Sequence, residues 1–116
     1  MTQSVLDKAK QHFAEQIGGE LLKTHIKEWN TDIYYKTISS MRTESKIMAL
    51  TQQGKTAEAL VESIVLKSFD QDGQRLFREA DRVTLLNEAD PKVLVALATT
   101  LNNASDMSME AIEKNL

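Results

Sequence analysis

The feature that most constrains how this chain can fold is an almost continuous apolar run over residues 57–69. A helix written through this run has a wide apolar arc, so one neighbouring element is too little to cover it. The run stops at an acidic turn over residues 70–73 and resumes at Leu76 and Phe77, which we expect to re-enter the core. We therefore expect a central helix that the rest of the chain covers on more than one side.

Other segments have apolar residues at helical spacing and are bounded by typical start and stop signals. Gly18-Gly19 ends the first helical pattern. Ser39-Ser40 and Asp90-Pro91 are N-terminal signals, and Thr56 is predicted to cap the central helix. The predicted helices occupy about residues 4–17, 40–53, 56–69, 79–87 and 90–103.

Residues 21–38 have a different period. Two β-prone runs, the first reaching Trp29 and the second containing Tyr34 and Tyr35, surround the turn sequence Asn30-Thr31-Asp32. They predict a β-hairpin. Because an isolated hairpin is only marginally stable, it must lie on the helices, pair with other strands or pair with another copy of the chain.

A chain of 116 residues has room for one core. We predict a mainly α (α+β) fold: a small helical domain over residues 1–103, with four to five helices and one short hairpin at about residues 21–38. Residues 104–116 are mostly small, polar or charged, and chain ends of this kind are often mobile. They are predicted to form a flexible C-terminal tail.

Composition argues against several classes of function. The net charge is −3 and basic residues alternate with acidic ones, which argues against nucleic acid as the main partner. Cysteine is absent from the sequence, which excludes disulfides and thiolate chemistry. The N-terminal residues lack a signal-peptide pattern, and no stretch reaches 18 uninterrupted apolar residues. We expect a cytoplasmic protein without a membrane partner.

The acidic turn invites comparison with a calcium-binding EF-hand loop. That loop needs glycine at position 6 and glutamate at position 12, but counting from Asp70 places Gly73 at position 4 and Asp81 at position 12. Asp72-Gly73 is also a common tight-turn pair. We predict a structural turn, with no metal, formed by Asp70, Asp72, Gly73, Leu76 and Phe77.

Residues for catalysis are not arranged in any recognisable motif. The sequence has no Gly-x-Ser-x-Gly elbow, and Gly54-Lys55-Thr56 lacks the preceding glycine of a phosphate-binding loop. His12 and His25 have no partner at ligand spacing and are interpreted as surface residues. We therefore predict no enzyme, no cofactor and no small-molecule substrate.

Protein contact is the remaining class of function. Aromatic side chains gather on the predicted hairpin, and methionines, which adapt to irregular surfaces, lie on the helix after it. All of these side chains are also explained by core or hairpin packing. The candidates for a protein-contact surface are Trp29, Tyr34, Tyr35, Met41 and Met48.

The order of these features resembles the tail assembly chaperones of long-tailed (siphovirus-like) bacteriophages and prophages. The resemblance covers about residues 23–103, and its most specific part is the Asp-x-Asp-Gly-x-x-Leu-Phe sequence at residues 70–77. The other matching pieces are Lys27-Glu28-Trp29, Tyr34-Tyr35-Lys36, Leu85-Leu86 and Leu101-Asn102-Asn103.

This resemblance implies a non-enzymatic protein that binds the tape measure protein, keeps it soluble and helps recruit the major tail protein, which forms the tail tube. It also implies self-association, residence in the cytoplasm of the bacterial host and absence from the mature virion. The alternative is a structural phage protein or a generic helical protein-interaction module. A virion proteome separates the two, because a chaperone is missing from purified particles.

In this family the chaperone is often also made as a longer product, by programmed ribosomal frameshifting near the end of the gene. Glu113-Lys114-Asn115 can be encoded by a slippery heptamer with an A-rich run over Lys114 and Asn115. The resemblance therefore implies a second, extended form of the chain.

Overall fold

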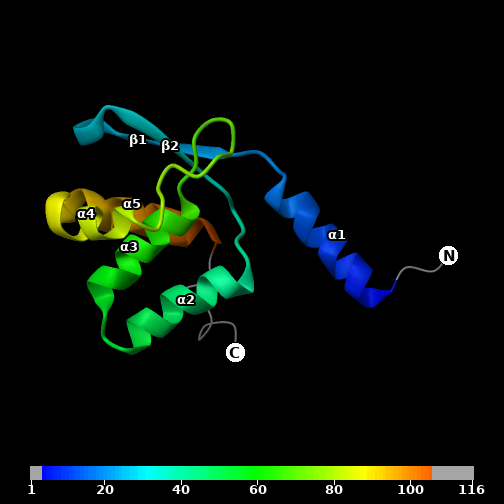
Figure 1. Ribbon diagram of the computed structural model, residues 1–116. Coiled ribbons are helices and arrows are strands. Elements are labelled where there is room, and N and C mark those ends of the chain that lie inside the picture. Colours follow the sequence, from blue (N-terminus) through cyan, green and yellow to red (C-terminus); the bar gives the residue numbers. More distant parts are fainter. Residues whose placement is uncertain (1–3, 106–116) are drawn as a thin grey trace.

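The computed structural model describes residues 4–105, and within them the predicted fold class is confirmed. Figure 1 shows the helices gathered beneath a two-stranded antiparallel hairpin, with α1 standing apart from them. The elements in chain order are α1 (Val5–Ile17), β1 (Leu22–Ile26), the 3-10 turn η1 (Lys27–Trp29), β2 (Thr31–Tyr35), α2 (Met41–Gln52), α3 (Thr56–Lys67), α4 (Asp81–Glu88) and α5 (Pro91–Ser105).

Two of the predicted start signals cap helices as expected. The Ser40 hydroxyl accepts a hydrogen bond from the Thr43 amide at 3.2 Å at the start of α2. The Asp90 carboxylate accepts one from the Lys92 amide at 2.9 Å, and Pro91 is the first residue of α5. Each side chain satisfies an amide that has no partner within its helix.

The prediction that Thr56 caps the central helix is wrong. The carbonyl of Lys55 already accepts the helical hydrogen bond from the Ala59 amide at 2.9 Å, so the cap position is Lys55 and no side chain caps it. Gly54, with φ +77°, turns the chain out of α2 just before this point. Thr56 therefore lies inside the first turn of α3.

The helix α3 lies at the centre of the fold, as its wide apolar arc predicts. Every residue from Val61 to Ser68 is buried, and α3 packs against α2, α4 and α5. The largest fully buried apolar side chains come from three elements and meet there. They are Ile33, Ile64, Val65, Leu97 and Leu101.

The hairpin lies on the helices, which was one of its three predicted placements. Ile26 and Ile33 are 8% and 1% exposed and belong to the core. The prediction that the first strand reaches Trp29 is wrong, because the chain leaves β1 in the 3-10 turn η1 and Asn30 takes the left-handed conformation with φ 47°. Asparagine tolerates this conformation better than most residues.

A buried polar network ties three helices together. Lys67 on α3 donates to the Glu44 carboxylate on α2 at 2.7 Å and to the Asn102 side-chain oxygen on α5 at 3.0 Å. Asn102 in turn donates to the Ser63 hydroxyl at 3.0 Å, and the Ser39 hydroxyl donates to Glu44. Hydrogen bonds thus compensate the cost of burying both charges.

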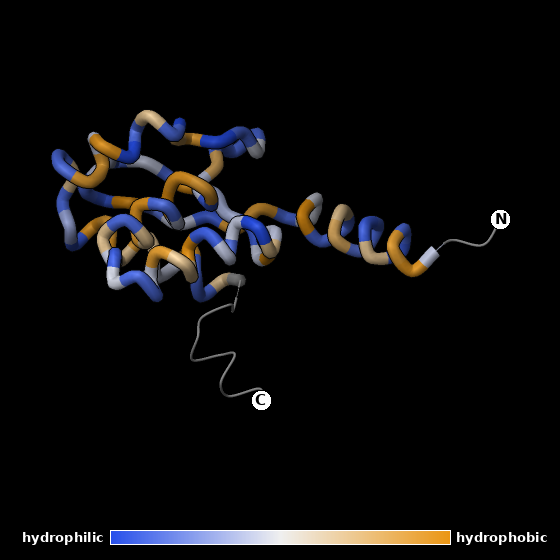
Figure 2. Tube along the Cα trace, turned by 60° about the horizontal axis from the view of Figure 1, so that its bottom comes forward, coloured by the Kyte–Doolittle hydropathy of each residue, from blue (hydrophilic) through white to orange (hydrophobic). Residues whose placement is uncertain are grey.

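The helix α1 projects away from this body in both Figure 1 and Figure 2. It has no buried residue, although hydrophobic residues recur on its successive turns in Figure 2. The radius of gyration is 15.4 Å and the longest dimension 54 Å. A compact domain of this length has a radius of gyration of about 13 Å, so the arm elongates the molecule.

The C-terminal part of α5 extends to Ser105, past the predicted exit at Asn103. The rest of the predicted tail, residues 106–116, lies outside the described residues. Over residues 4–105, no helix is long and apolar enough to cross a membrane.

Candidate protein-binding surface

The predicted contact residues lie on two parts of the fold, the hairpin and α2. Trp29 and Tyr35 are half-buried and pack against the core, and Tyr34 is half-buried on the same hairpin. Met41, which is 69% exposed, and the half-buried Met48 lie on α2. Figure 1 shows the hairpin and α2 on opposite sides of α3, so the aromatic and the methionine side chains belong to different parts of the body.

The acidic turn is held by its own first residue. One oxygen of the Asp70 carboxylate accepts hydrogen bonds from the Asp72 amide at 2.9 Å and the Gln74 amide at 3.0 Å. Gly73 has φ +82°, which favours glycine. No group of three or more potential ligand side chains suited to a metal ion occurs among residues 4–105. Asp70 is thus engaged in shaping the turn.

After this turn the chain pairs briefly with the end of α3, and the expectation that Leu76 enters the core is wrong. The Leu76 amide donates to the Ser68 carbonyl at 3.2 Å, and the chain bends at Leu76. Leu76 is 37% exposed at this bend, whereas Phe77 packs against the core.

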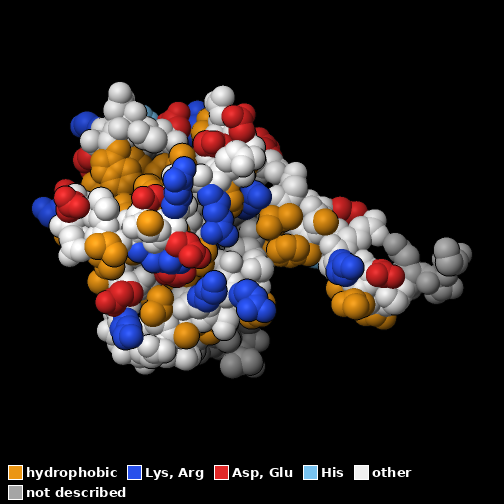
Figure 3. Space-filling view, viewed as in Figure 1, with side chains coloured by type: hydrophobic (Ala, Val, Ile, Leu, Met, Phe, Trp, Pro, Cys, Tyr) orange, Lys and Arg blue, Asp and Glu red, His pale blue; other side chains and the backbone are white. Residues whose placement is uncertain are grey.

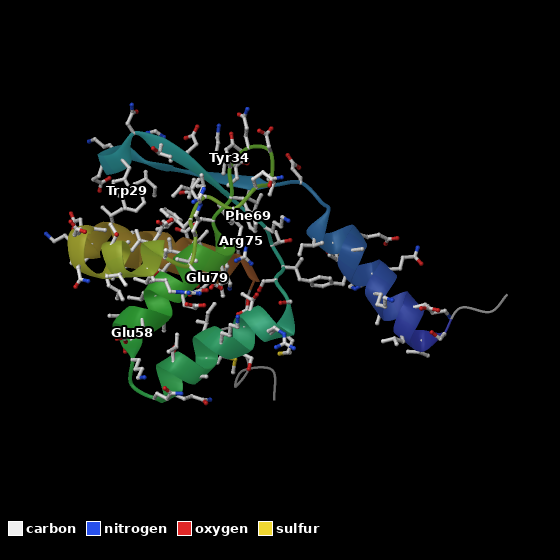
Figure 4. The ribbon with its side chains drawn as sticks, in the orientation of Figure 1. Trp29, Tyr34, Glu58, Phe69, Arg75 and Glu79 are labelled. Carbon is white, nitrogen blue, oxygen red and sulfur yellow. The ribbon has the colours of Figure 1, made fainter. Side chains whose placement is uncertain are left out.

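The same segment closes the free side of β2. Tyr34 and Phe69 exchange both backbone hydrogen bonds, at 2.9 and 2.8 Å, and Phe69 is also bridged to Arg75. In Figure 4 the labelled Phe69 and Arg75 lie together beneath the hairpin. This pairing fixes Phe69 and Arg75 next to the strand that leads to α2.

A cleft of about 180 Å³ opens at this place, between the base of α1 and the body. Its walls come from α1, from the segment between β2 and α2, and from the end of α3 and the loop after it. The apolar residues that line it are Phe13, Ile17, Ile38, Leu66 and Phe69.

The charged residues that line this cleft are Lys36, Lys67 and Arg75. Lys36 holds its ammonium group 4.7 Å from the centre of the Phe69 ring, a favourable cation–π distance. Figure 3 shows lysine and arginine side chains gathered on this face of the body, next to hydrophobic surface at the base of α1. The cleft therefore combines apolar walls with positive charge.

A second hollow of about 610 Å³ lies between α2, α3 and α4, and its charges are mixed. Arg82 donates two hydrogen bonds to the Glu62 carboxylate, at 2.6 and 2.8 Å, and these bonds raise the pKa of Arg82. Glu58 and Glu79, both labelled in Figure 4, also line the hollow. With both signs present, this surface favours no particular charge on a partner.

The sequence did not predict a site from the residues that line the cleft, nor from those that line the second hollow. The residues of the cleft come from segments far apart in the chain, residues 13–17, 36–43 and 66–75. Apolar periodicity indicates Phe13 and Ile17 as one helix face, but it gives no signal of what lies opposite them.

Comparison with known proteins adds one finding about the fold. No family model matches the chain, and no curated protein matches it. Among solved structures, the fold is similar to a protein described as the bacteriophage HK97 tail assembly chaperone, with a TM-score of 0.57. The similarity covers 81% of this chain and 96% of the HK97 chain, at 15% sequence identity.

The chain thus has the fold of a phage tail assembly chaperone, as its sequence resemblance predicts. At 15% identity the likeness establishes the fold.

Proposed function

We propose that this protein is a phage tail assembly chaperone that binds the tape measure protein, keeps it soluble and helps recruit tail tube subunits. The similarity in fold to the HK97 chaperone carries this proposal. It is supported by α1, which presents Val5 and Leu6 at 82% and 69% exposure. Apolar surface of this kind is suited to cover the apolar faces of a long helical partner.

The proposed role is non-enzymatic and is carried out in the cytoplasm of the bacterial host, before the virion is complete. It includes self-association, because many copies are needed along one long partner. The exposed edge of β1 is one candidate contact, since in the described part of the chain β1 pairs with β2 alone. Sedimentation velocity over a range of concentrations tests this association.

Co-expression with the tape measure protein tests the function directly. The tape measure protein is the product of the very long reading frame that we expect next to this gene. We expect the partner to remain in the soluble fraction only when the chaperone is present. Equal solubility with and without the chaperone would exclude the proposed role.

The alternative function, a structural phage protein, predicts a different location. Mass spectrometry of purified virions separates the two, because a chaperone is absent from particles and a structural protein is present in them.

The coding sequence separately tests the extended form. A slippery heptamer over residues 113–115 and an overlapping downstream frame are expected, and the lack of either removes that part of the proposal.

A further inference from the structure

The cleft at the base of α1 is lined by positively charged side chains, and no carboxylate in the described part of its lining neutralises them. Among the described residues, none of the side chains that line it is acidic. The Lys67 charge is compensated inside the body by Glu44, at 2.7 Å. Lys36 is half-buried over the Phe69 ring and Arg75 is exposed. Lys36 and Arg75 are therefore the charges that an approaching partner meets.

The apolar surface continues from the cleft along α1. Ile17 and Phe13 line the cleft, and the same helix carries Leu6 and Val5 further out, where they are 69% and 82% exposed. From Val5 to Ile17 the helix axis rises about 18 Å at 1.5 Å per residue. This length matches the apolar stripe of a partner helix of about three turns.

We propose that the cleft and the exposed apolar face of α1 together bind a helix of a partner protein whose apolar stripe is flanked by acidic residues. The apolar stripe covers α1, and the carboxylates lie against Lys36 and Arg75. The inference rests on the proposed function and adds the chemical class of the segment that is bound. The positive charge of the cleft favours an acidic helix as its partner. The second hollow carries charges of both signs and favours neither an acidic nor a basic partner.

Two synthetic 18-residue helical peptides test the proposal against the full-length protein. They share one leucine stripe, and their polar positions are glutamate in the first peptide and lysine in the second. Calorimetric titration is expected to give at least tenfold tighter binding of the glutamate peptide. This preference is expected to weaken as salt is raised, because exposed charges are screened.

Variants then locate the site. K36E/R75E is expected to abolish or reverse the preference for the glutamate peptide, whereas the control K92E, a single charge reversal at an exposed lysine on α5, keeps it. L6S/F13S is expected to weaken both peptides at least tenfold, because it removes apolar contact. Val83, which is 66% exposed on α4, supplies the control V83S. Circular dichroism verifies that every variant is folded.

Four results would overturn the proposal. Equal binding of the two peptides, or unchanged binding by K36E/R75E, would remove the charge argument. Dimers that block the peptides and dissociate in L6S/F13S would assign the face to a second copy of the chain. A several-fold gain in affinity on deleting residues 106–116 would assign it to the chain's own C-terminal segment.

The peptide-binding test of the cleft and the solubility test of the proposed function can fail independently. If the glutamate peptide binds as expected but the tape measure protein stays insoluble, the site stands and the function fails. If K36E/R75E loses peptide binding yet keeps the tape measure protein soluble, the function stands and the cleft is not its binding site.

Discussion

Lys67 carries a positive charge in the interior of the domain, where its side chain is only 6% exposed. An ammonium group removed from water is costly unless it is paired and hydrogen-bonded. Here Glu44 and Asn102 supply both compensations, from two different helices. The relative positions of α2, α3 and α5 are thus linked through one side chain.

Removing one member of this pair is expected to be far worse than removing both. K67M should lower the free energy of unfolding by about 3–5 kcal/mol, because the Glu44 carboxylate remains buried without its charge partner. The double variant K67M/E44L should recover most of that loss. Urea denaturation measures both, and a loss below about 1 kcal/mol for K67M would mean that the pair does not control stability.

The helices α3 and α1 differ most in burial: α3 is largely buried, and α1 has no buried residue. Ile64 on α3 is 0% exposed, so I64A should lower the free energy of unfolding by about 2–5 kcal/mol through lost burial and a residual cavity. V83A on α4, at a side chain that is 66% exposed, serves as the control and should stay within about 0.5 kcal/mol of the wild type. Similar losses for the two variants would contradict the central position of α3.

The arm α1 should exchange its amide hydrogens much faster than α3. None of its residues is buried, and an isolated helix of 13 residues is only marginally stable in water. Hydrogen exchange followed by mass spectrometry is expected to show α1 exchanging early and α3 exchanging only on global unfolding. Equal protection of both helices in the free protein would mean that something covers α1 in solution.

Sequence patterns predicted the elements well because the patterns are local. Asp90-Pro91 starts α5, and the wide apolar arc identifies α3 as central. Lys67 illustrates what stayed hidden. In the sequence it is one polar break in an apolar run, and its partners Glu44 and Asn102 are 23 and 35 residues away. Spacing rules relate near neighbours on a helix, so they cannot find such a network.

The placement of α1 was equally inaccessible to pattern reasoning. Its apolar residues recur with the same period whether the helix packs on its own body or projects from it. The cleft depends on that placement, because Phe13 and Ile17 face residues that arrive from the loops around α2 and α3. The site therefore appears only when three distant segments are placed together.

The whole molecule is elongated by its arm, and small-angle X-ray scattering measures this directly. The distance distribution is expected to reach at least 54 Å, well beyond the 33 and 26 Å of the other two axes. A variant that lacks residues 1–17 should lose the extended part of the curve. A curve that ends near the shorter dimensions in the full-length protein would mean that α1 folds back onto the body.

The packing of helices that are neighbours along the chain also affects how fast the protein folds. The helix α3 contacts α2 before it and α4 after it, so much of the fold forms between neighbours along the chain. Helical domains with local contacts fold in microseconds to milliseconds. A ribosome that adds about 5–20 residues per second needs about 6–23 s to make 116 residues. Synthesis, not folding, therefore sets the delay before a folded copy of this chain is available.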